Sequence, residues 1–170
     1  ILFDKTNTDF SDYKTSTIQR RIKRRMILNK KNKLSDYIDY LKNSEKEVFL
    51  LHKELLVIVT SFFRDKDAFM ELEKTVEELL LKKEKNEPIR VWVSGCATGE
   101  EAYTIAIILY EILEKNDLNN KIQIFATDIS TEAISIARKG IYLEEDLKDL
   151  SQIILDKYFE KKDGLFKLSK

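Results

Sequence analysis

Residues 91–109 read VWVSGCATGEEAYTIAIIL and change character twice. They begin as an apolar, β-rich run, turn on Gly95 and Gly99, and continue with helical apolar spacing over about residues 100–115. A second apolar run, IQIFATD, follows the polar turn NDLNN. Strand, helix and strand joined by short loops predict a βαβ unit with parallel strands and a right-handed crossover. The chain after Ile89 is therefore expected to be α/β.

The chain before Pro88 has a different pattern, with no glycine and no other proline. Apolar residues recur there at helical spacing in three stripes. These are Ile18, Ile22 and Met26; Leu34, Tyr37, Ile38 and Leu41; and Val48, Leu51, Leu55 and Val59. Ser44 and Glu47 have the spacing of a capping box for the third helix. We expect a helical domain over residues 1–64, a linker helix and linker over 65–88, and an α/β domain over 89–170.

The end of the chain continues with helical and turn signals. Residues 131–139 look helical, with Ser130 as the N-cap and Gly140 just past the C-terminus. SQIILDKYF predicts one more helix, and LFKLS could start a strand. Between Ile89 and Lys170 the sequence therefore indicates two or three strands.

Composition excludes several kinds of function. The 30 basic and 30 acidic residues balance, so no overall charge selects nucleic acid or a membrane surface. One cysteine cannot form an internal disulfide, and one histidine argues against a multi-histidine metal site or a Ser-His relay. No apolar run approaches the roughly 20 residues of a membrane span, and no signal-peptide core is present, so the expected location is the cytoplasm.

The glycine turn raises the question of which ligand tolerates acidic residues at a helix start. Ligands of an open α/β sheet lie beyond the carboxyl ends of the strands, near the helix N-terminus. Asp128 ends the second strand, where its carboxylate can accept both hydroxyls of a ribose. A pyrophosphate is disfavoured, because the loop lacks the middle glycine of G-x-G-x-x-G and Glu100 would repel it. S-adenosylmethionine fits better than NAD, and a tight turn without a ligand is the alternative.

Five segments together carry a resemblance to a known family. DFSDYKTSTIQRRIKRRM, VTSFFRDKDAF, IRVWVSGCATGEEAYTIAI, IFATDIS and AISIARKGIY occur in the order and spacing of CheR-type chemotaxis receptor methyltransferases, including forms within multidomain sensors. The resemblance implies a small helical N-terminal domain and the first part of a Rossmann-like class I methyltransferase domain that uses S-adenosylmethionine. It also implies cytoplasmic receptor helices rich in glutamate as partners.

The resemblance assigns roles to individual residues. Cofactor-contacting positions are Thr60, Arg64, Gly95, Cys96, Ala97, Gly99, Glu100 and Asp128. Through Thr60 and Arg64 the helical domain is expected to contribute to the site. A glutamate acceptor is ionised at neutral pH, so catalysis reduces to placement and needs no general base. A non-catalytic cofactor-sensing or receptor-docking module is the alternative function.

Arg64 is the candidate catalytic residue, because a fixed guanidinium can hold the carboxylate of the cofactor or of the acceptor. Its alternative role is a salt bridge to Asp65 or Asp67. Cys96 is expected to be a small loop residue and not a nucleophile. The aromatic residues Tyr103, Trp92, Phe62 and Phe63 are expected in the core, although Phe62 or Phe63 could instead wall an adenine.

Charge is segregated along the chain, since nine Lys or Arg and no acid lie between Lys14 and Lys33. The resemblance favours a docking surface for an acidic receptor helix, formed by Arg20, Arg21, Arg24 and Arg25. A solvated helix face is the alternative. RNA is disfavoured, because no aromatic residue interrupts residues 18–33 to stack on bases.

The family continues beyond the length of this sequence with further strands, including a strand-bearing insertion that docks receptor tails in some members. None of these strands is expected before Lys170. We therefore expect a chain that ends there to transfer no methyl group, to bind cofactor weakly if at all, and to expose an unpaired strand. Such an edge could pair with a second copy in a sheet-edge dimer.

Overall fold

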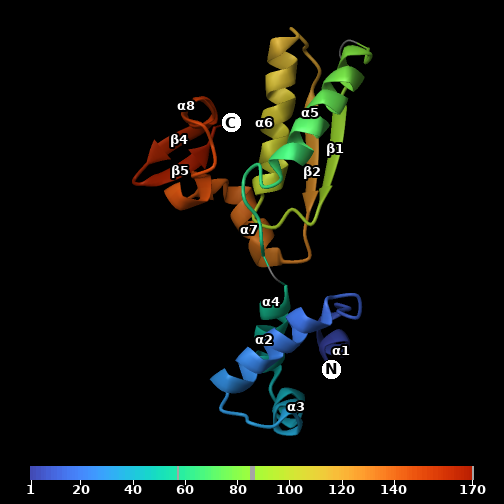
Figure 1. The fold of residues 1–170 in the computed structure, drawn as a ribbon, viewed down its shortest axis with the longest axis vertical. Helices are drawn as coiled ribbons and strands as arrows, with labels where there is room; N and C mark the ends of the chain where they lie inside the picture. Colours follow the sequence, from blue (N-terminus) through green and yellow to red (C-terminus); the bar gives the residue numbers. More distant parts are fainter. Residues whose placement is uncertain (57, 85–86, 170) are drawn as a thin grey trace. The chain divides into compact units, whose positions relative to one another are not determined.

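The computed structural model describes residues 1–56, 58–84 and 87–169. Two compact units are present, Ile1–Val57 and Ile58–Lys170 (Figure 1). None of the helices within the described ranges is long and apolar enough to cross a membrane.

The first unit is built from helices, and its described residues contain no strand, as expected. The helices are α1 (Leu2–Thr6), α2 (Thr15–Leu28), α3 (Leu34–Asn43) and α4 (Glu45–Leu55). The predicted stripes meet in one core, which contains Phe10, Tyr37, Leu41, Val48, Leu51 and Leu55, with Ile18, Ile22 and Met26 packed against it. Val59 was wrongly placed in the third stripe, because α4 ends at Leu55 and Val59 is 58% exposed.

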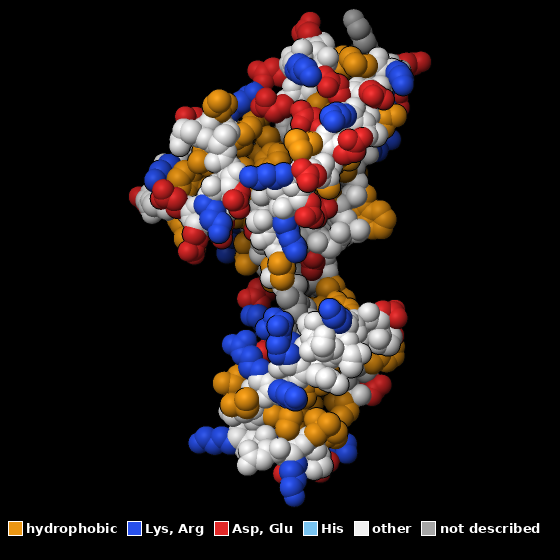
Figure 2. Space-filling model, in the orientation of Figure 1, with side chains coloured by type: hydrophobic (Ala, Val, Ile, Leu, Met, Phe, Trp, Pro, Cys, Tyr) orange, Lys and Arg blue, Asp and Glu red, His pale blue; other side chains and the backbone are white. Residues whose placement is uncertain are grey.

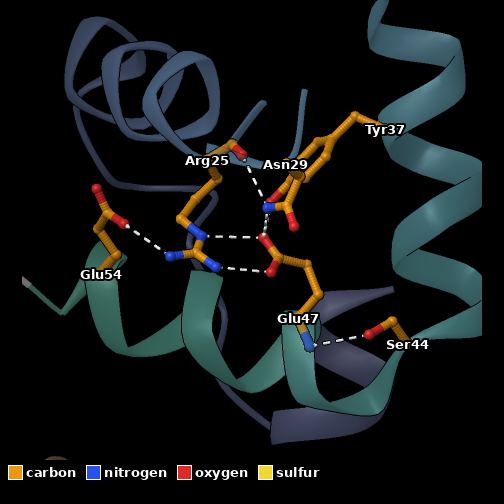
Figure 3. A network of polar contacts seen from close by, with 6 residues as sticks. All are labelled: Arg25, Asn29, Tyr37, Ser44, Glu47 and Glu54. Carbon is orange, nitrogen blue, oxygen red and sulfur yellow. Dashed lines mark hydrogen bonds and ion pairs between the residues drawn. The ribbon is translucent and has the colours of Figure 1, made fainter. Parts of the chain in front are cut away.

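Only half of the predicted capping box forms at the start of α4. Ser44 is the N-cap, and its hydroxyl accepts a hydrogen bond from the Glu47 amide at 3.2 Å. The expected second bond, from the Ser44 amide to the Glu47 carboxylate, does not form. This carboxylate is turned into the core instead, and Glu47 is 2% exposed (Figure 3). The sequence pattern of a capping box therefore did not indicate that the Glu47 carboxylate is buried.

Four donor groups satisfy the buried carboxylate of Glu47. Arg25 donates from Nε and Nη2 at 2.9 and 2.6 Å. Asn29 donates at 2.9 Å, and the Tyr37 hydroxyl donates at 2.8 Å. Burial alone would raise the pKa of Glu47, but the bonds from Arg25, Tyr37 and Asn29 outweigh it and lower the pKa. This network ties α2, α3 and α4 together (Figure 3).

The second unit mixes helices and strands. Its helices are α5 (Lys66–Leu81), α6 (Glu100–Lys115), α7 (Thr131–Lys139), the 3-10 helix η1 (Glu144–Leu147) and α8 (Gln152–Tyr158). Its strands are β1 (Ile89–Ser94), β2 (Ile122–Thr127), β3 (Ile141–Tyr142), β4 (Phe159–Lys162) and β5 (Leu165–Leu168).

The parallel strands and the connecting helix of the predicted βαβ unit are confirmed. β1 and β2 are parallel, in a register that runs from Ile89 opposite Ile122 to Ser94 opposite Thr127, and α6 connects them. α6 packs on the sheet through a core that contains Leu80, Ile89, Ile108, Leu109, Ile112 and Leu113. The carboxyl ends of both strands therefore lie together, beside the start of α6 (Figure 1).

The structure divides between Val57 and Ile58, whereas the helical domain was expected to end at residue 64 and the α/β domain to begin at residue 89. Segment 58–88 belongs to the second unit, because Leu80 of α5 is buried in the core that α6 forms with β1. Phe62 and Phe63 also pack within that unit. The segment expected to link the two domains is therefore part of the second one.

The second unit also contains a three-stranded antiparallel sheet in the order β3-β5-β4, of which the sequence analysis expected one strand. The strand expected at LFKLS is β5, and the helix expected in SQIILDKYF is α8. β4 and β5 form a hairpin through Asp163 and Gly164, both with positive φ, and Asp-Gly is a known hairpin signal. The described residues from Ile89 onward thus contain five strands, where two or three were expected.

The expectation that Trp92 lies in the core is also wrong. Along β1, Ile89 and Val93 face α5 and α6, whereas Trp92 points to the other side of the sheet and is 72% exposed. Its indole N–H donates to the Thr127 hydroxyl at 3.0 Å. Phe125, paired with Trp92 across the strands, is 57% exposed. Among the described residues β1 and β2 pair only with each other.

Candidate functional site

The loop from Gly95 to Gly99 joins the end of β1 to the start of α6. Its backbone has positive φ at three alternate residues, 72° at Gly95, 47° at Ala97 and 103° at Gly99. The amides of Gly95 and Cys96 both donate to the Thr127 carbonyl, at 2.7 and 3.0 Å. The loop is therefore fastened to the end of β2.

The two glycines serve different purposes. A Cβ at Gly99 would lie 3.0 Å from the Cβ of Ala137 and 3.1 Å from both Tyr103 and Tyr142, so glycine is required by close packing as well as by φ. At Gly95, no described residue other than its two chain neighbours has a heavy atom within 4 Å of an added Cβ, and the glycine is exposed. The backbone of Gly95 thus stays open to an approaching molecule.

Asp128 follows β2, and its two carboxylate oxygens hold two backbone amides, one in the glycine loop and one at the start of α7. Oδ2 accepts from the Ala97 amide and Oδ1 accepts from the Ser130 amide, each at 2.8 Å. Each carboxylate oxygen has a second lone pair, and the side chain is only half-buried, so hydroxyl donors can still reach it. The structure therefore brings Asp128 and the loop together, as the βαβ prediction required.

Glu100 is the first residue of α6 and is 6% exposed. The Thr98 hydroxyl lies 2.8 and 2.7 Å from its two oxygens and donates to this carboxylate. A negative charge at a helix N-terminus is stabilised by the helix dipole. The neighbouring Glu101 is exposed. The loop thus holds one oriented, largely dehydrated carboxylate that suits a cationic group.

Thr60 and Arg64, the residues through which the helical domain was expected to contribute to the site, lie in the Ile58–Lys170 unit. Arg64 is exposed, and its Nη1 donates to the Val59 carbonyl at 2.6 Å. Within the described residues it makes no bond to the glycine loop. Thr60 is half-buried.

The segment around Arg64 is anchored through its neighbours. Phe62 is 1% exposed and meets Tyr142 edge to face, with ring centres 5.0 Å apart. The Phe63 amide donates to the hydroxyl of the buried Thr104 in α6 at 3.2 Å. Phe62 is therefore a core residue, as expected, and its neighbours hold Arg64 beside the first turns of α6.

Cys96 is a buried small residue, 1% exposed, as expected. Burial, and after it the charge of Asp128, raise the pKa of its thiol, which opposes nucleophilic chemistry. A cavity of about 250 Å³ borders the loop between α6, β2 and α7, and its lining includes Cys96, Ala102, Ile124 and Ile134. It lies on the face of the sheet rather than beyond the strand ends, and ligand pockets usually start at roughly 300 Å³.

Sequence reasoning missed two residues that shape the loop. The Tyr142 hydroxyl, on β3, donates to the Thr98 carbonyl at 2.9 Å, and Thr98 in turn holds Glu100. Thr98 lies inside the motif and could have been singled out as a donor to the acid two positions later. Tyr142 had no local signal, because its role depends on how the small sheet packs.

The basic helix predicted as a docking surface is α2. Arg20 is exposed, and Arg24, 64% exposed, pairs with Glu54 at 3.3 Å. Arg21 is half-buried, and its enclosed Nε has no hydrogen-bond partner in the part of the chain that the structure describes. Arg25 is only 13% exposed and is bound by Glu47, so it does not belong to the docking set. Figure 2 shows basic side chains gathered over the helical unit.

Comparisons with known proteins agree with this division into two units. Residues 58–170 match the family described as CheR methyltransferase, SAM binding domain, and residues 1–56 match the CheR methyltransferase all-alpha domain. SAM is S-adenosylmethionine, the methyl donor that this domain binds.

Three relatives show the extent of the similarity. The chain is 32% identical over 163 residues to a chemotaxis protein methyltransferase of Borreliella burgdorferi, covering 93% of this chain and 58% of that protein. It is 32% identical over 172 residues to chemotaxis protein methyltransferase 2 of Vibrio cholerae, covering 98% and 58%. It is also 39% identical over 159 residues to an uncharacterized 104.1 kDa protein of Rhodobacter capsulatus, covering 93% and 17%.

The chain spans little more than half the length of the two chemotaxis relatives. Both family matches nevertheless cover whole units of the structure, and the larger one contains the loop, Glu100 and Asp128. The chain belongs to the CheR methyltransferase family and contains its all-helical domain and its S-adenosylmethionine-binding domain.

Proposed function

We propose that this chain is part of a protein-glutamate O-methyltransferase that acts on chemotaxis receptors. The observation that carries the proposal is the loop from Gly95 to Gly99, which is open at Gly95 and flanked by the carboxylates of Glu100 and Asp128. Glu100 at the helix start disfavours a phosphate-rich cofactor, and the two carboxylates suit a cofactor with ribose hydroxyls and a cationic amino-acid end.

The residues present fit the parts of S-adenosylmethionine. Asp128 would accept hydrogen bonds from the ribose hydroxyls, and Glu100 would pair with the ammonium group. The backbone at Gly95 would pass close under the methionine end. Arg64, exposed on the Ile58–Lys170 unit, would hold a carboxylate, either that of the cofactor or that of the acceptor.

The bound cofactor supplies an electrophilic methyl group on its sulfonium. The work of the protein is then placement of an acceptor carboxylate in line with that methyl group, which can contribute roughly 7–11 kcal/mol in favourable systems. A glutamate side chain has an ordinary pKa of about 4.3 and is already ionised at neutral pH. A general base is not needed, which suits a site whose thiol, Cys96, is buried and protonated.

We further propose that α2 presents the receptor-docking surface through Arg20, Arg21 and Arg24, with the exposed Lys23 beside them. The support is the basic run of this helix and the exposure of Arg20 and Arg24. An acidic receptor helix is the matching partner. Arg25 is excluded from this surface because Glu47 holds its guanidinium inside the helical unit.

Equilibrium titration of the full-length protein with S-adenosylmethionine and S-adenosylhomocysteine tests the cofactor part of the proposal. A methyltransferase should bind both at one site per chain. A docking module that had lost the activity should bind neither. Incorporation of labelled methyl groups into receptor, with release of label by alkaline hydrolysis of the ester, tests the acceptor part.

A further inference from the structure

Tyr142 lies outside the set of residues proposed to touch the cofactor, yet its phenol ends at the glycine loop. The residue is on β3 and is 3% exposed. Its hydroxyl donates to the Thr98 carbonyl at 2.9 Å. The same oxygen lies 3.1 Å from the position that a Cβ at Gly99 would take, so the hydroxyl packs directly against the loop backbone.

Thr98 connects this contact to the proposed cofactor carboxylate. Its backbone carbonyl accepts the bond from Tyr142, while its side-chain hydroxyl donates to Glu100 at 2.7–2.8 Å. Any shift of the Thr98 backbone therefore moves the hydroxyl that orients Glu100. Glu100 is nearly enclosed, and within the described residues its side chain has no other hydrogen-bond donor.

Tyr142 is itself held firmly by the core of the second unit. Its ring meets Phe62 and Tyr103 edge to face, with ring centres 5.0 and 6.2 Å apart. In the small sheet it pairs with Phe166 of β5. Burial, and after it the charge of Glu100, raise the pKa of the Tyr142 hydroxyl, so it remains a hydrogen-bond donor at neutral pH.

We propose that Tyr142 is a positioning residue for the cofactor loop. Its hydroxyl fixes the Thr98 backbone, Thr98 orients the Glu100 carboxylate, and Glu100 then meets the ammonium group of the methionine end. The small antiparallel sheet thereby helps to set the affinity for the amino-acid half of the cofactor. This inference rests on the proposed role of Glu100.

Tyr103 provides a matched control within the same cluster. Its hydroxyl donates at 2.6 Å to the Ala137 carbonyl, which belongs to α7 and not to the loop. Burial raises the pKa of Tyr103 as it does that of Tyr142. Tyr103→Phe and Tyr142→Phe each remove one buried hydroxyl, and only the second removes a bond to the loop.

The test compares two ligands that share a nucleoside. S-adenosylhomocysteine carries the amino-acid group, whereas 5′-methylthioadenosine lacks it. In calorimetric titrations of the full-length protein, Tyr142→Phe should weaken S-adenosylhomocysteine binding about 3- to 10-fold and leave 5′-methylthioadenosine binding unchanged. Tyr103→Phe should leave both affinities unchanged. Thr98→Val, which removes the hydroxyl that orients Glu100, should reproduce the loss seen with Tyr142→Phe.

Each other outcome counts against the inference. Unchanged S-adenosylhomocysteine affinity in Tyr142→Phe would overturn it, and so would an equal loss for both ligands, since that indicates general support of the fold. If Tyr142→Phe failed to fold, unchanged affinity in Thr98→Val would overturn the proposed link to Glu100. If the wild-type protein bound neither ligand, the proposed function itself would be wrong.

Discussion

The carboxylates of Asp128 and Glu100 differ in the hydrogen bonds that they make within the protein. Asp128 uses both oxygens to hold backbone amides, those of Ala97 and Ser130. Among the described residues, the hydroxyl of Thr98 is the one hydrogen-bond donor that orients Glu100. Replacing Asp128 should therefore disturb the loop as well as remove ligand contacts, whereas replacing Glu100 should act mainly on the ligand.

We predict that Asp128→Ala weakens binding of S-adenosylmethionine at least tenfold. Hydrogen bonds from ribose hydroxyls to a charged acceptor contribute roughly 1.5–3 kcal/mol each, and the loop also loses the bond from the Ala97 amide. Isothermal titration measures the affinity, and circular dichroism verifies that the variant is folded. An unchanged dissociation constant in a folded variant would rule out the ribose assignment.

A second prediction separates Glu100 from its exposed neighbour. Glu100→Gln keeps the shape of the side chain but removes the charge that would pair with the ammonium group, so affinity for S-adenosylhomocysteine should fall about tenfold. Glu101→Gln removes an equal charge from an exposed position at the same helix start and should change affinity less than twofold. Equal losses of affinity in the two variants would show that the ligand responds to the negative charge at this helix start in general and not to a specific contact with Glu100.

At the scale of elements, periodicity and turn chemistry predicted most of the structure. The apolar stripes located α2, α3 and α4, and Ser130 and Gly140 marked both ends of α7. The strand expected at LFKLS is β5, but β3 and β4 were missed, because a two-residue strand has no period and β4 carries mainly charged residues. Their pairing is a tertiary effect, and only the Asp163-Gly164 turn signalled it.

The candidate site was predictable to the extent that it is local in sequence. The glycine loop, Glu100 and Asp128 follow from one βαβ unit, so sequence spacing placed them together. The burial of Glu47 and the contact of Tyr142 with the loop depend on packing between elements that are distant in sequence. Arg25 was misjudged for the same reason, since a basic run does not show which side chain turns inward.

The helical unit offers a test of its buried ion pair. Arg25→Ala leaves the carboxylate of Glu47 enclosed without its main partner and should lower the free energy of unfolding by about 3–5 kcal/mol. Arg24→Ala removes a largely exposed ion pair with Glu54 and should cost less than about 1 kcal/mol. Urea denaturation followed by helical circular dichroism measures both. Similar losses would contradict the structural role of the network.

The same network predicts a dependence on pH. The folded protein lowers the pKa of Glu47, so its contribution to stability is complete above the unfolded value of about 4.3 and disappears as pH falls through the folded value. The stability difference between wild type and Glu47→Gln should therefore be large at pH 7 and shrink below about pH 4. A difference that stayed constant with pH would show that the charge of Glu47 does not stabilise the unit.

At the scale of the whole molecule, a neutral chain divides into two oppositely charged units. Residues 1–57 contain 13 Lys and Arg and 8 Asp and Glu, whereas residues 58–170 contain 17 and 22. The proposed docking helix lies in the basic unit and the proposed cofactor site in the acidic one. Receptor binding and cofactor binding should therefore respond differently to salt and to charge reversal.

We predict that Arg20→Glu combined with Lys23→Glu reduces receptor binding and leaves cofactor affinity unchanged. Both residues are exposed on α2, and Arg24 is retained because it pairs with Glu54. Binding by the wild type should weaken as salt rises, since exposed charges are screened over about 8–10 Å. The matched control, Lys74→Glu with Lys82→Glu, changes the same charge in the second unit. Equal loss in both pairs would contradict docking through α2.

We propose above all that the loop between β1 and α6, with Glu100 and Asp128, is an S-adenosylmethionine site. The most direct measurement is calorimetric titration of the full-length protein with S-adenosylhomocysteine, alongside Asp128→Ala. We predict one saturable site per chain in the wild type and at least tenfold weaker binding in the variant. Absence of binding by the folded wild type at about 1 mM ligand, or equal affinity of the two proteins, would contradict the claim.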